Sequence, residues 1–468
     1  MAEQFDLVII GSGNAGYHPA IRASQLGMSV ALVEKESYLG GTCLNWGCIP
    51  TKAFLQSALM LNNLKEHGEQ FGIMAEGVEF DFSKANEHKN QVVGQLQKGV
   101  QGLMKKNKIQ VFTGTGSFVE ANKVKVEGED GEEELEAENV LIATGSGVKS
   151  LPGMEFDGEK IISSDDVVSS DSYSGSVIIL GAGAVGVEFA SMYNDFGADV
   201  TIVEMLDRIV PLEDPEISEA LKKEFENRDI RVLTGTQADP ESLEKTDDGV
   251  KIEVETEDGE ETLEAEAILV AVGRRTVTED LKLDEVGIEL NDDSTIPADE
   301  YGRTSVDGVY AAGDVIGGYW LAHAASHEGI VAVEHMAGEN PLPMDQTLVP
   351  RVTFCRPEVA SFGLSKAEAE EEGYEVKEAN FPFRAIGKAL IEGEPNGFVK
   401  VVADSETDLL LGMHAIGPHV TDLIAEGVFA KLVEGTPQEM GMAIHAHPSL
   451  SEVMGEAAMA VDGNAIHI

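Results

Sequence analysis

The sequence predicts an α/β protein in which one parallel-sheet unit with a glycine-rich turn occurs twice, followed by an α+β region at the C-terminal end. Three observations predict this fold class. A strand, glycine turn and helix near the N-terminus recur 170 residues later, and a strand pair with an Asp-Gly turn recurs at a separation of 128 residues. After about residue 348 the glycine pattern stops, and strand patterns alternate with apolar helices.

The first unit opens with a buried-strand pattern at 5–10 (FDLVII), which leads into Gly11, Gly13 and Gly16. A helical stretch and a second strand that ends at Glu34 complete a Rossmann-like dinucleotide-binding fingerprint. Gly11 permits the tight turn, Gly13 lets a pyrophosphate approach the backbone, and Gly16 allows the helix to pack closely on the strand. The N-terminal end of that helix then attracts the phosphates.

The second unit repeats this pattern. Its glycines and its acid, each displaced by 170 residues, are Gly181, Gly183, Gly186 and Glu204. Two such units predict two different dinucleotides. An acid at the end of the second strand binds the ribose hydroxyls and favours NAD over NADP, and only Arg208 follows closely enough to meet a 2′-phosphate.

The second repeat aligns residues 129–145 with 257–273, and 12 of the 17 positions are identical. Each copy predicts a hairpin turn at Asp-Gly, led by Asp130 or Asp258, followed by a buried strand and a glycine turn. The first unit is longer by 42 residues, the difference between the two separations, and the extra length holds two close cysteines.

A further strand is predicted at 308–312, with Asp314 just beyond it and a helix at 321–335. A carboxylate at such a strand end can accept a hydrogen bond from a polyol chain, although helix termini and turns also favour acids. The region from about Leu348 has no glycine fingerprint, so it is expected to serve a role other than nucleotide binding, such as dimerisation.

The composition excludes several classes of function. The 468 residues include 33 Lys and Arg against 84 Asp and Glu, giving a formal charge of −51, which argues against binding to nucleic acid or to an anionic membrane. No apolar run is long enough to span a bilayer, and the start MAEQFDLVII lacks the features of a signal peptide, so we expect a soluble, cytoplasmic protein. We expect the charge to form a halophilic surface on solvated hairpins and helix faces.

Cys43 and Cys48 lie in the sequence GGTCLNWGCIPTK. Their spacing is not that of a zinc site, and no second ligand pair is near, so no metal is expected. On a regular helix, residues five apart diverge by about 140°, so a disulfide between them needs a distorted helix start, which Gly47 and Pro50 permit. A helix N-terminus and Lys52 would stabilise a thiolate, which indicates redox-active cysteines rather than two buried structural ones. The third cysteine, at 355, is expected to be a buried apolar residue.

His447 lies five residues before Glu452 in HAHPSLSE. A histidine oriented by a carboxylate can act as a general acid and base, although surface histidines near glutamates are common.

Together these segments resemble the pyridine nucleotide-disulfide oxidoreductases over essentially the whole chain, and most closely the branch that oxidises dihydrolipoyl groups. The resemblance is carried by GGTCLNWGCIPTK, ATGS (143–146), GAGAVGVE (181–188), AAGDV (311–315) and HAHPSLSE. It implies oxidation of dihydrolipoamide to lipoamide with reduction of NAD⁺ to NADH, through FAD in the first unit, a Cys43-Cys48 redox disulfide, and NAD in the second unit.

The resemblance also implies roles for single residues. Cys48 would be the thiolate beside the flavin and Cys43 the interchange thiol. Lys52 and Glu188 would flank the flavin, and His447, paired with Glu452, would reach the cysteines from the other subunit of an obligate homodimer. The cofactor-binding candidates are Gly11, Gly13, Gly16, Glu34, Thr42, Lys52, Thr144, Gly145, Ser146, Asp314, Gly181, Gly183, Gly186, Glu204 and Gly273. Glu34 would bind the adenosine ribose of FAD, Glu204 that of NAD, and Asp314 the ribityl chain.

The implied domains are an FAD-binding domain with the redox cysteine helix at 1–147, an NAD-binding domain at 148–277, a central segment completing the FAD domain at 278–346, and a dimerisation domain at 347–468. The implied partners are lipoyl domains or the acyltransferase component of 2-oxo acid dehydrogenase complexes, or the carrier protein of glycine cleavage. Two alternatives remain open: an NADPH-dependent glutathione reductase-like enzyme, and a non-catalytic structural subunit of a multienzyme complex.

The sequence departs from the family pattern at two places. Thr276 and Val277 stand where the family usually has Pro and Asn, which puts the FAD-to-NAD crossover in doubt. His18 and Pro19 interrupt the small residues of the first helix, so we expect that helix to begin at Pro19. The His447-Pro448 bond is similar to one that is cis in relatives.

Overall fold

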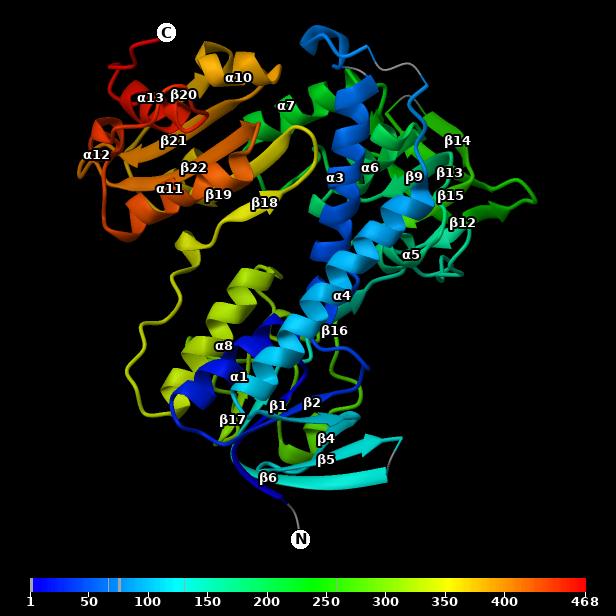
Figure 1. Cartoon of the computed structure of the whole chain (residues 1–468), viewed down its shortest axis with the longest axis vertical. Helices are drawn as coiled ribbons and strands as arrows, with labels where there is room; N and C mark the ends of the chain where they lie inside the picture. The colour runs from blue at the N-terminus through cyan, green and yellow to red at the C-terminus, as the bar shows by residue number, and fades with distance from the viewer. Residues whose placement is uncertain (1–2, 66, 75–76, 130, 258) are drawn as a thin grey trace. The chain divides into compact units, whose positions relative to one another are not determined.

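The computed structural model describes residues 3–65, 67–74, 77–129, 131–257 and 259–468, and it divides into two compact units (Figure 1). Unit 1 contains the described residues of 1–53, 83–149 and 274–344, and unit 2 those of 54–82, 150–273 and 345–468. The four domain boundaries expected from the sequence stay predictions.

Unit 1 is built on a seven-stranded sheet. Its parallel part has the order β3 (Gln110–Thr113), β2 (Val30–Glu34), β1 (Glu3–Ile10), β6 (Gly131–Ile142) and β17 (Val309–Ala311). The N-terminal part of β6 also pairs antiparallel with β5 (Lys123–Gly128), which in turn pairs with β4 (Thr115–Glu120). The strands expected near 5–10, before Glu34 and at 308–312 are all present.

Both faces of this sheet are covered, because successive side chains of β1 enter two different cores. Leu7 and Ile9 pack with residues of α1 (Asn14–Gln25), α4 (Phe82–Lys106) and α8 (Ala322–Met336). Val8 and Ile10 pack with residues of β4 and β5 and of the turn η2 (Leu283–Val286). These helices hold the first glycine turn against the ends of β1 and β2.

The helix start expected at Pro19 is wrong, because α1 begins at Asn14 and Pro19 lies inside it. The proline removes one helical hydrogen bond, but its ring packs against α8 at Gly329, where a Cβ would come within 2.8 Å of the Pro19 Cγ. This close contact between α1 and α8 stabilises the proline where the local sequence alone disfavours it.

The first part of unit 2 repeats the design of unit 1. Its parallel sheet has the order β11 (Arg231–Leu233), β10 (Asp199–Val203), β9 (Ser176–Leu180), β15 (Ala267–Val270) and β8 (Ile161–Ile162). A separate antiparallel sheet contains β12 (Gln237–Lys245), β13 (Val250–Thr256) and β14 (Gly259–Ala265). The hairpins β5–β6 and β13–β14 match the predicted repeat, and the turn residues Asp130 and Asp258 lie outside the described residues.

The helices of this part are α5 (Ser164–Ser169), α6 (Ala184–Phe196) and α7 (Pro215–Glu226). The α6 helix follows the second glycine turn as α1 follows the first. The carboxylate of Asp195, on α6, accepts hydrogen bonds from Arg228 at 2.8 Å and from Arg356 at 2.7 Å. This buried cluster joins the second Rossmann-like part to the C-terminal part of the same unit.

The C-terminal part of unit 2 is an antiparallel sheet with helices packed on it. The strand order is β18 (Arg351–Thr353), β19 (Glu358–Gly363), β22 (Leu410–Gly417), β21 (Phe398–Asp404) and β20 (Val376–Pro382). The helices are α9 (Lys366–Glu371), α10 (Gly387–Glu392), α11 (Val420–Leu432), α12 (Pro437–Met442) and α13 (Glu452–Ala460). Cys355 lies just beyond β18 and is buried, so the expectation of a buried residue is confirmed.

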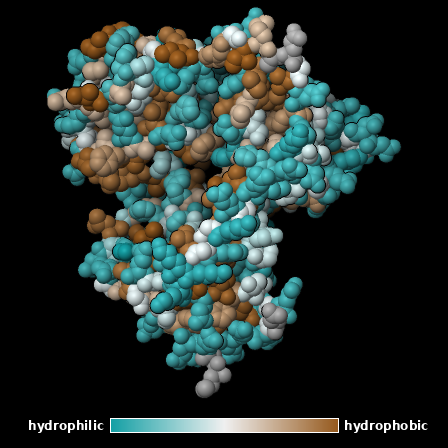
Figure 2. All heavy atoms as spheres, viewed as in Figure 1, coloured by the Kyte–Doolittle hydropathy of each residue, from teal (hydrophilic) through white to brown (hydrophobic). Residues whose placement is uncertain are grey.

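Part of the acidic surface lies on the antiparallel hairpin of unit 2. Along β13, Ile252 and Val254 are buried while Glu253 and Glu255 are exposed, and Figure 2 shows hydrophilic residues over this hairpin. None of the helices formed by the described residues has the length and apolar character needed to cross a membrane.

Candidate active site

The first glycine turn in unit 1 contains two glycines that the fold requires and a third, Gly13, where a Cβ would not clash. A Cβ on Gly11, whose φ is +105°, would lie 2.3 Å from the Ala143 oxygen, and a Cβ on Gly16 would lie 1.9 Å from the Gly11 oxygen. At Gly13 the nearest atom would be 3.9 Å away. The turn therefore leaves room for a phosphate group at the N-terminal end of α1.

Glu34, at the end of β2, is 8 % exposed, and its carboxylate contacts the same turn. Its Oε2 accepts hydrogen bonds from Ser12 N at 2.9 Å and from Ser12 Oγ at 2.6 Å, and its Oε1 accepts one from Glu36 N at 2.9 Å. The Ser12 hydroxyl in turn accepts a bond from Gly40 N at 3.1 Å. Sequence reasoning missed Ser12, although it stands between two fingerprint glycines.

The glycine turn in unit 2 has the same construction. A Cβ on Gly181 would lie 2.5 Å from the Ala271 oxygen and one on Gly186 would lie 1.9 Å from the Gly181 oxygen, whereas Gly183 has no atom within 4 Å. Glu204 accepts hydrogen bonds from Ala182 N at 2.6 Å and Leu206 N at 2.8 Å. Both turns thus combine space for a pyrophosphate with an acid that can meet a ribose, so the residues fit two dinucleotides.

Cys43 and Cys48 lie on two separate helices, because α2 (Gly41–Asn45) ends before the turn at Trp46 and α3 (Cys48–Lys65) begins at Cys48. The regular helix is therefore interrupted between the two cysteines, in keeping with the distorted helix start that Gly47 and Pro50 permit. A Cβ at Gly47 would lie 3.0 Å from the Thr42 oxygen, so the turn is tight. Both thiols are half-buried in this structure.

The two thiols are close enough to interact. A side-chain hydrogen bond with Cys48 and then burial raise the pKa of the Cys43 thiol well above its usual range, while Lys52 acts in the opposite direction. Cys43 therefore keeps its proton while it faces the Cys48 sulfur. Burial and the nearby Cys43 also raise the pKa of Tyr17, which places this phenol on α1 near the same site.

Asp314 follows β17 and accepts a hydrogen bond from the Ser146 hydroxyl. Arg274 donates to the same Ser146 hydroxyl at 2.7 Å and to the Ser146 oxygen at 2.8 Å. Glu328, on α8, accepts from Gly313 N at 2.9 Å, and burial raises its pKa. The sequence did not point to Arg274, although it directly follows the candidate Gly273.

Thr276 and Val277, which depart from the family pattern, are accommodated beside these residues. Val277 donates its N–H to the Gly145 oxygen at 3.0 Å and accepts from the Thr144 hydroxyl at 2.6 Å. The Thr276 hydroxyl donates to the Ser294 oxygen at 2.7 Å. Val277 thus connects the crossover to Thr144 and Gly145 through its backbone, which does not depend on its side chain.

His447 and Glu452 lie together in unit 2, where His447 Nδ1 is 2.9 Å from Glu452 Oε1. A hydrogen bond from Ser449 N, and then the interaction with His447, lower the pKa of Glu452. The His447 side chain is 79 % exposed, and the His447-Pro448 bond is cis. This arrangement orients the ring and leaves its Nε2 accessible.

Three further placements bear on the predicted site. Glu188, buried on α6, accepts a hydrogen bond from Phe354 N at 2.9 Å. Its predicted partner Lys52 belongs to unit 1, so that pair stays a prediction, as does the approach of His447 to the cysteines of another subunit.

The described residues contain no group of three or more His, Cys, Asp or Glu that could hold a metal ion.

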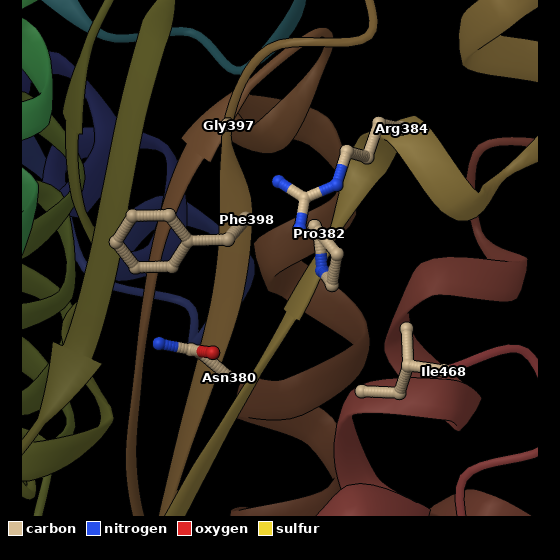
Figure 3. A pocket seen from close by; sticks show the side chains of 6 residues that line it. All are labelled: Asn380, Pro382, Arg384, Gly397, Phe398 and Ile468. Atoms are coloured by element: carbon tan, nitrogen blue, oxygen red, sulfur yellow. The ribbon is translucent and has the colours of Figure 1, made fainter.

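A cavity of about 420 Å³ in unit 2 lies apart from the candidate residues. Its lining is Asn380, Pro382, Arg384, Gly397, Phe398 and Ile468. Figure 3 shows the side chains of Asn380 and Pro382 on β20, Phe398 on β21, Arg384 and Ile468 around this cavity. None of these residues was predicted to take part in the site.

Comparison with known proteins decides the family. The family model for pyridine nucleotide-disulphide oxidoreductases matches residues 5–329. The chain belongs to this family. The model for the dimerisation domain of pyridine nucleotide-disulphide oxidoreductases matches residues 349–458, so the fold class expected from the sequence is confirmed for this oxidoreductase.

The relatives of this pyridine nucleotide-disulphide oxidoreductase include proteins named dihydrolipoyl dehydrogenase. One from Bacillus subtilis is 47 % identical, and the match covers 100 % of this chain and 100 % of that protein. One from Haloferax volcanii is 41 % identical, and the match covers 99 % of this chain and 97 % of that protein. Among solved structures, LpdA from Mycobacterium tuberculosis matches with a TM-score of 0.91 and 27 % identity, covering 98 % of this chain and 100 % of that one. RclA from Escherichia coli, described as an HOCl-induced flavoprotein disulfide reductase, matches at 0.85 and 26 %, covering 97 % and 99 %.

Proposed function

We propose that this chain is a dihydrolipoyl dehydrogenase that oxidises dihydrolipoyl groups to lipoyl groups and reduces NAD⁺ to NADH, with FAD as its cofactor. The observation that carries the proposal is the thiol pair at the α2–α3 break, which adjoins the first glycine turn in a chain that aligns from end to end with relatives of that name.

The residues of unit 1 fit FAD. Gly13 would leave space for the pyrophosphate, Glu34 would bind the adenosine ribose, and Asp314, held by Ser146, would accept from the ribityl chain. When bound, FAD would supply the two-electron chemistry that links oxidation of the dithiol to reduction of NAD⁺. Gly183 and Glu204 of unit 2 bind that NAD⁺ in the same manner.

The remaining chemistry belongs to the thiols and the histidine. His447, held by Glu452, removes the proton from one thiol of the dihydrolipoyl group. The resulting thiolate attacks Cys43 of the Cys43-Cys48 disulfide, so that a mixed disulfide forms and Cys48 leaves as a thiolate. The second substrate thiolate then attacks the sulfur of the first, which closes the lipoyl disulfide and releases Cys43. The substrate has lost two electrons and the enzyme dithiol has gained them.

This order of attack agrees with the electrostatics of the thiols. The raised pKa of Cys43 favours its protonation when it is released from the mixed disulfide. Lys52 acts against the rise in the pKa of Cys43, as expected of a cation that stabilises a thiolate charge in this pair.

We propose that the enzyme acts as a homodimer in which His447 of a second copy serves the cysteines, in keeping with the match of residues 349–458 to a dimerisation domain. The dimerisation region exposes apolar side chains on and near α11 and α12, and Figure 2 shows apolar residues gathered over this part. They are Phe429, Leu432, Val433, Met442 and Ile444. A second copy of the chain would cover this surface.

The test is a steady-state comparison of two substrate pairs. We expect rapid turnover with dihydrolipoamide and NAD⁺ and slow turnover with glutathione disulfide and NADPH, because Glu204 is placed for free ribose hydroxyls and Arg208 bonds to the Pro211 oxygen. The purified protein should be yellow and should redden when dihydrolipoamide is added without oxygen. Faster turnover of the glutathione pair would favour the alternative, and a colourless protein without either activity would favour a structural subunit.

We further propose that the enzyme works in the cytoplasm, in keeping with its three cysteines, and that its physiological substrate is a protein-bound dihydrolipoyl group. The carrier would be a lipoyl domain of a 2-oxo acid dehydrogenase complex or the carrier protein of glycine cleavage. Copurification of the acyltransferase component with the enzyme distinguishes the first from the second.

A further inference from the structure

Gln97 occupies an unusual position on α4. The same face of this helix carries Val93, Val100 and Met104, which are buried at helical spacing, and Val100 and Met104 pack with Leu44 of α2. A glutamine in an apolar row loses its contacts with water unless its amide finds a partner. Gln97 is half-buried, so its partner indicates what this position does.

The partner is Asn45, the last residue of α2. Gln97 Nε2 donates to Asn45 Oδ1 at 2.8 Å. The Asn45 Nδ2 group then donates to the Gly41 oxygen at 2.9 Å and to the Leu39 oxygen at 3.2 Å. Asn45 therefore uses its acceptor and both of its donors, and Gln97 fixes which way the amide points.

Asn45 in this way connects two parts of the site. Its bonds to the Leu39 and Gly41 oxygens close the turn before α2, and Gly40 N in that turn donates to the Ser12 oxygen and hydroxyl at 3.1 Å each. At the other side, α2 carries Cys43, two residues before Asn45. A continuous set of hydrogen bonds thus runs from α4 through α2 to the first glycine turn.

We propose that Gln97 and Asn45 are positioning residues for the redox dithiol. The short α2 helix has only five residues, so its own backbone bonds hold it weakly, and the Gln97 donor is what fixes it to the long α4 helix. Fixing α2 sets the place of Cys43 relative to Cys48 at the start of α3. This inference rests on the proposed function, in which these two thiols exchange with the substrate.

The test compares variants of Gln97 in the FAD-containing dimer. Gln97→Leu removes the donor and keeps an apolar side chain, Gln97→Glu places an acceptor against an acceptor, and Gln97→Lys keeps a donor of similar reach. The control is Gln95→Leu, because Gln95 is exposed on the same helix. The measurements are the rate at which iodoacetamide alkylates Cys43 in the reduced enzyme, the kcat for dihydrolipoamide with NAD⁺, and the rate of NADH oxidation by a dye, which does not use the dithiol.

We expect Gln97→Leu and Gln97→Glu to raise the alkylation rate about fivefold, the effect of one lost hydrogen bond, and to lower kcat while the dye reaction is unchanged. Gln97→Lys should restore wild-type rates, and Gln95→Leu should not differ from wild type. Wild-type rates in Gln97→Leu, or equal loss in Gln97→Lys, would overturn the proposal in favour of simple packing. If the proposed function is incorrect, the wild-type enzyme will not oxidise dihydrolipoamide. The alkylation rates of Cys43 would still decide whether Gln97 positions this thiol.

Discussion

An added methyl group should lower stability at Gly186 but not at Gly183, the two glycines of the second fingerprint that are compared next. In Gly186→Ala the new Cβ would lie 1.9 Å from the Gly181 oxygen, and real Cβ atoms keep at least 3.0 Å, so the backbone must shift by about 1.1 Å. The atom it meets is backbone, and Ile179 of β9 lies 3.5 Å away on the same side. The helix α6 must therefore move away from β9. Overpacking of this kind costs about 1–3 kcal/mol, which lowers the melting temperature by roughly 2–12 °C.

Gly183→Ala should leave stability unchanged, because no atom lies within 4 Å of the new Cβ. The methyl group instead occupies the space at the N-terminal end of α6 where we place the pyrophosphate of NAD⁺. We expect the KM for NAD⁺ to rise about tenfold, the equivalent of about 1.4 kcal/mol of binding energy. The kcat for dihydrolipoamide at saturating NAD⁺ should change little.

The assays are thermal unfolding of the FAD-containing enzyme without NAD⁺, and steady-state kinetics with varied NAD⁺. The reasoning about packing fails if Gly186→Ala melts with the wild type. The placement of the pyrophosphate fails if Gly183→Ala keeps the wild-type KM. A variant of Gly183 that loses stability instead would show that the open space is needed by the fold and not by the nucleotide.

Four further predictions follow from other parts of the structure. Asp195→Asn leaves the guanidinium groups of Arg228 and Arg356 without their shared carboxylate. The free energy of unfolding should fall by about 3–5 kcal/mol, which a lower melting temperature would show and an unchanged one would contradict. His447→Ala should nearly abolish dihydrolipoamide oxidation and spare the NADH–dye reaction, and equal loss of both would refute the acid–base role. Burial lowers the pKa of His414 below 6.5, so the unfolded chain takes up a proton that the folded chain does not, and stability falls as the pH drops below about 6.5. His414→Gln should reduce that slope by up to about 1.4 kcal/mol per pH unit in urea unfolding, and an identical slope would exclude His414 as its source. Because the charge is −51, stability and activity should rise with KCl to molar levels, where screening acts within about 3 Å, and maximal stability in dilute buffer would disprove this.

The fingerprints could be predicted from the sequence because their physics is local. Gly11 and Gly181 need a positive φ, and Gly16 and Gly186 need room for a carbonyl oxygen. Each glycine in the sequence therefore indicates the backbone geometry at its own position. The strands that lead to Glu34 and Glu204 were also placed correctly, because a buried parallel strand appears in the sequence as a short apolar run.

The residues that the sequence missed depend on contacts that no local pattern shows. Pro19 was taken as a helix start because the sequence does not reveal that Gly329 of a distant helix packs against its ring. Gln97 breaks the apolar row of α4, and only the position of Asn45 explains it. The predicted pairing of Lys52 with Glu188, and the approach of His447 from a second subunit, depend on how whole parts of the molecule meet and stay predictions.

The hydrogen bonds of Glu204 bear on any attempt to change the coenzyme. Glu204, which we propose to bind the ribose hydroxyls, also accepts the Ala182 N–H inside the glycine turn. Replacing Glu204 with a basic residue to admit a 2′-phosphate would remove the acceptor of that buried N–H and loosen the turn that binds the pyrophosphate. A coenzyme switch designed at this one position would therefore weaken the binding of both NAD and NADP. A successful design must supply a new hydrogen-bond acceptor for the Ala182 N–H together with the new cation.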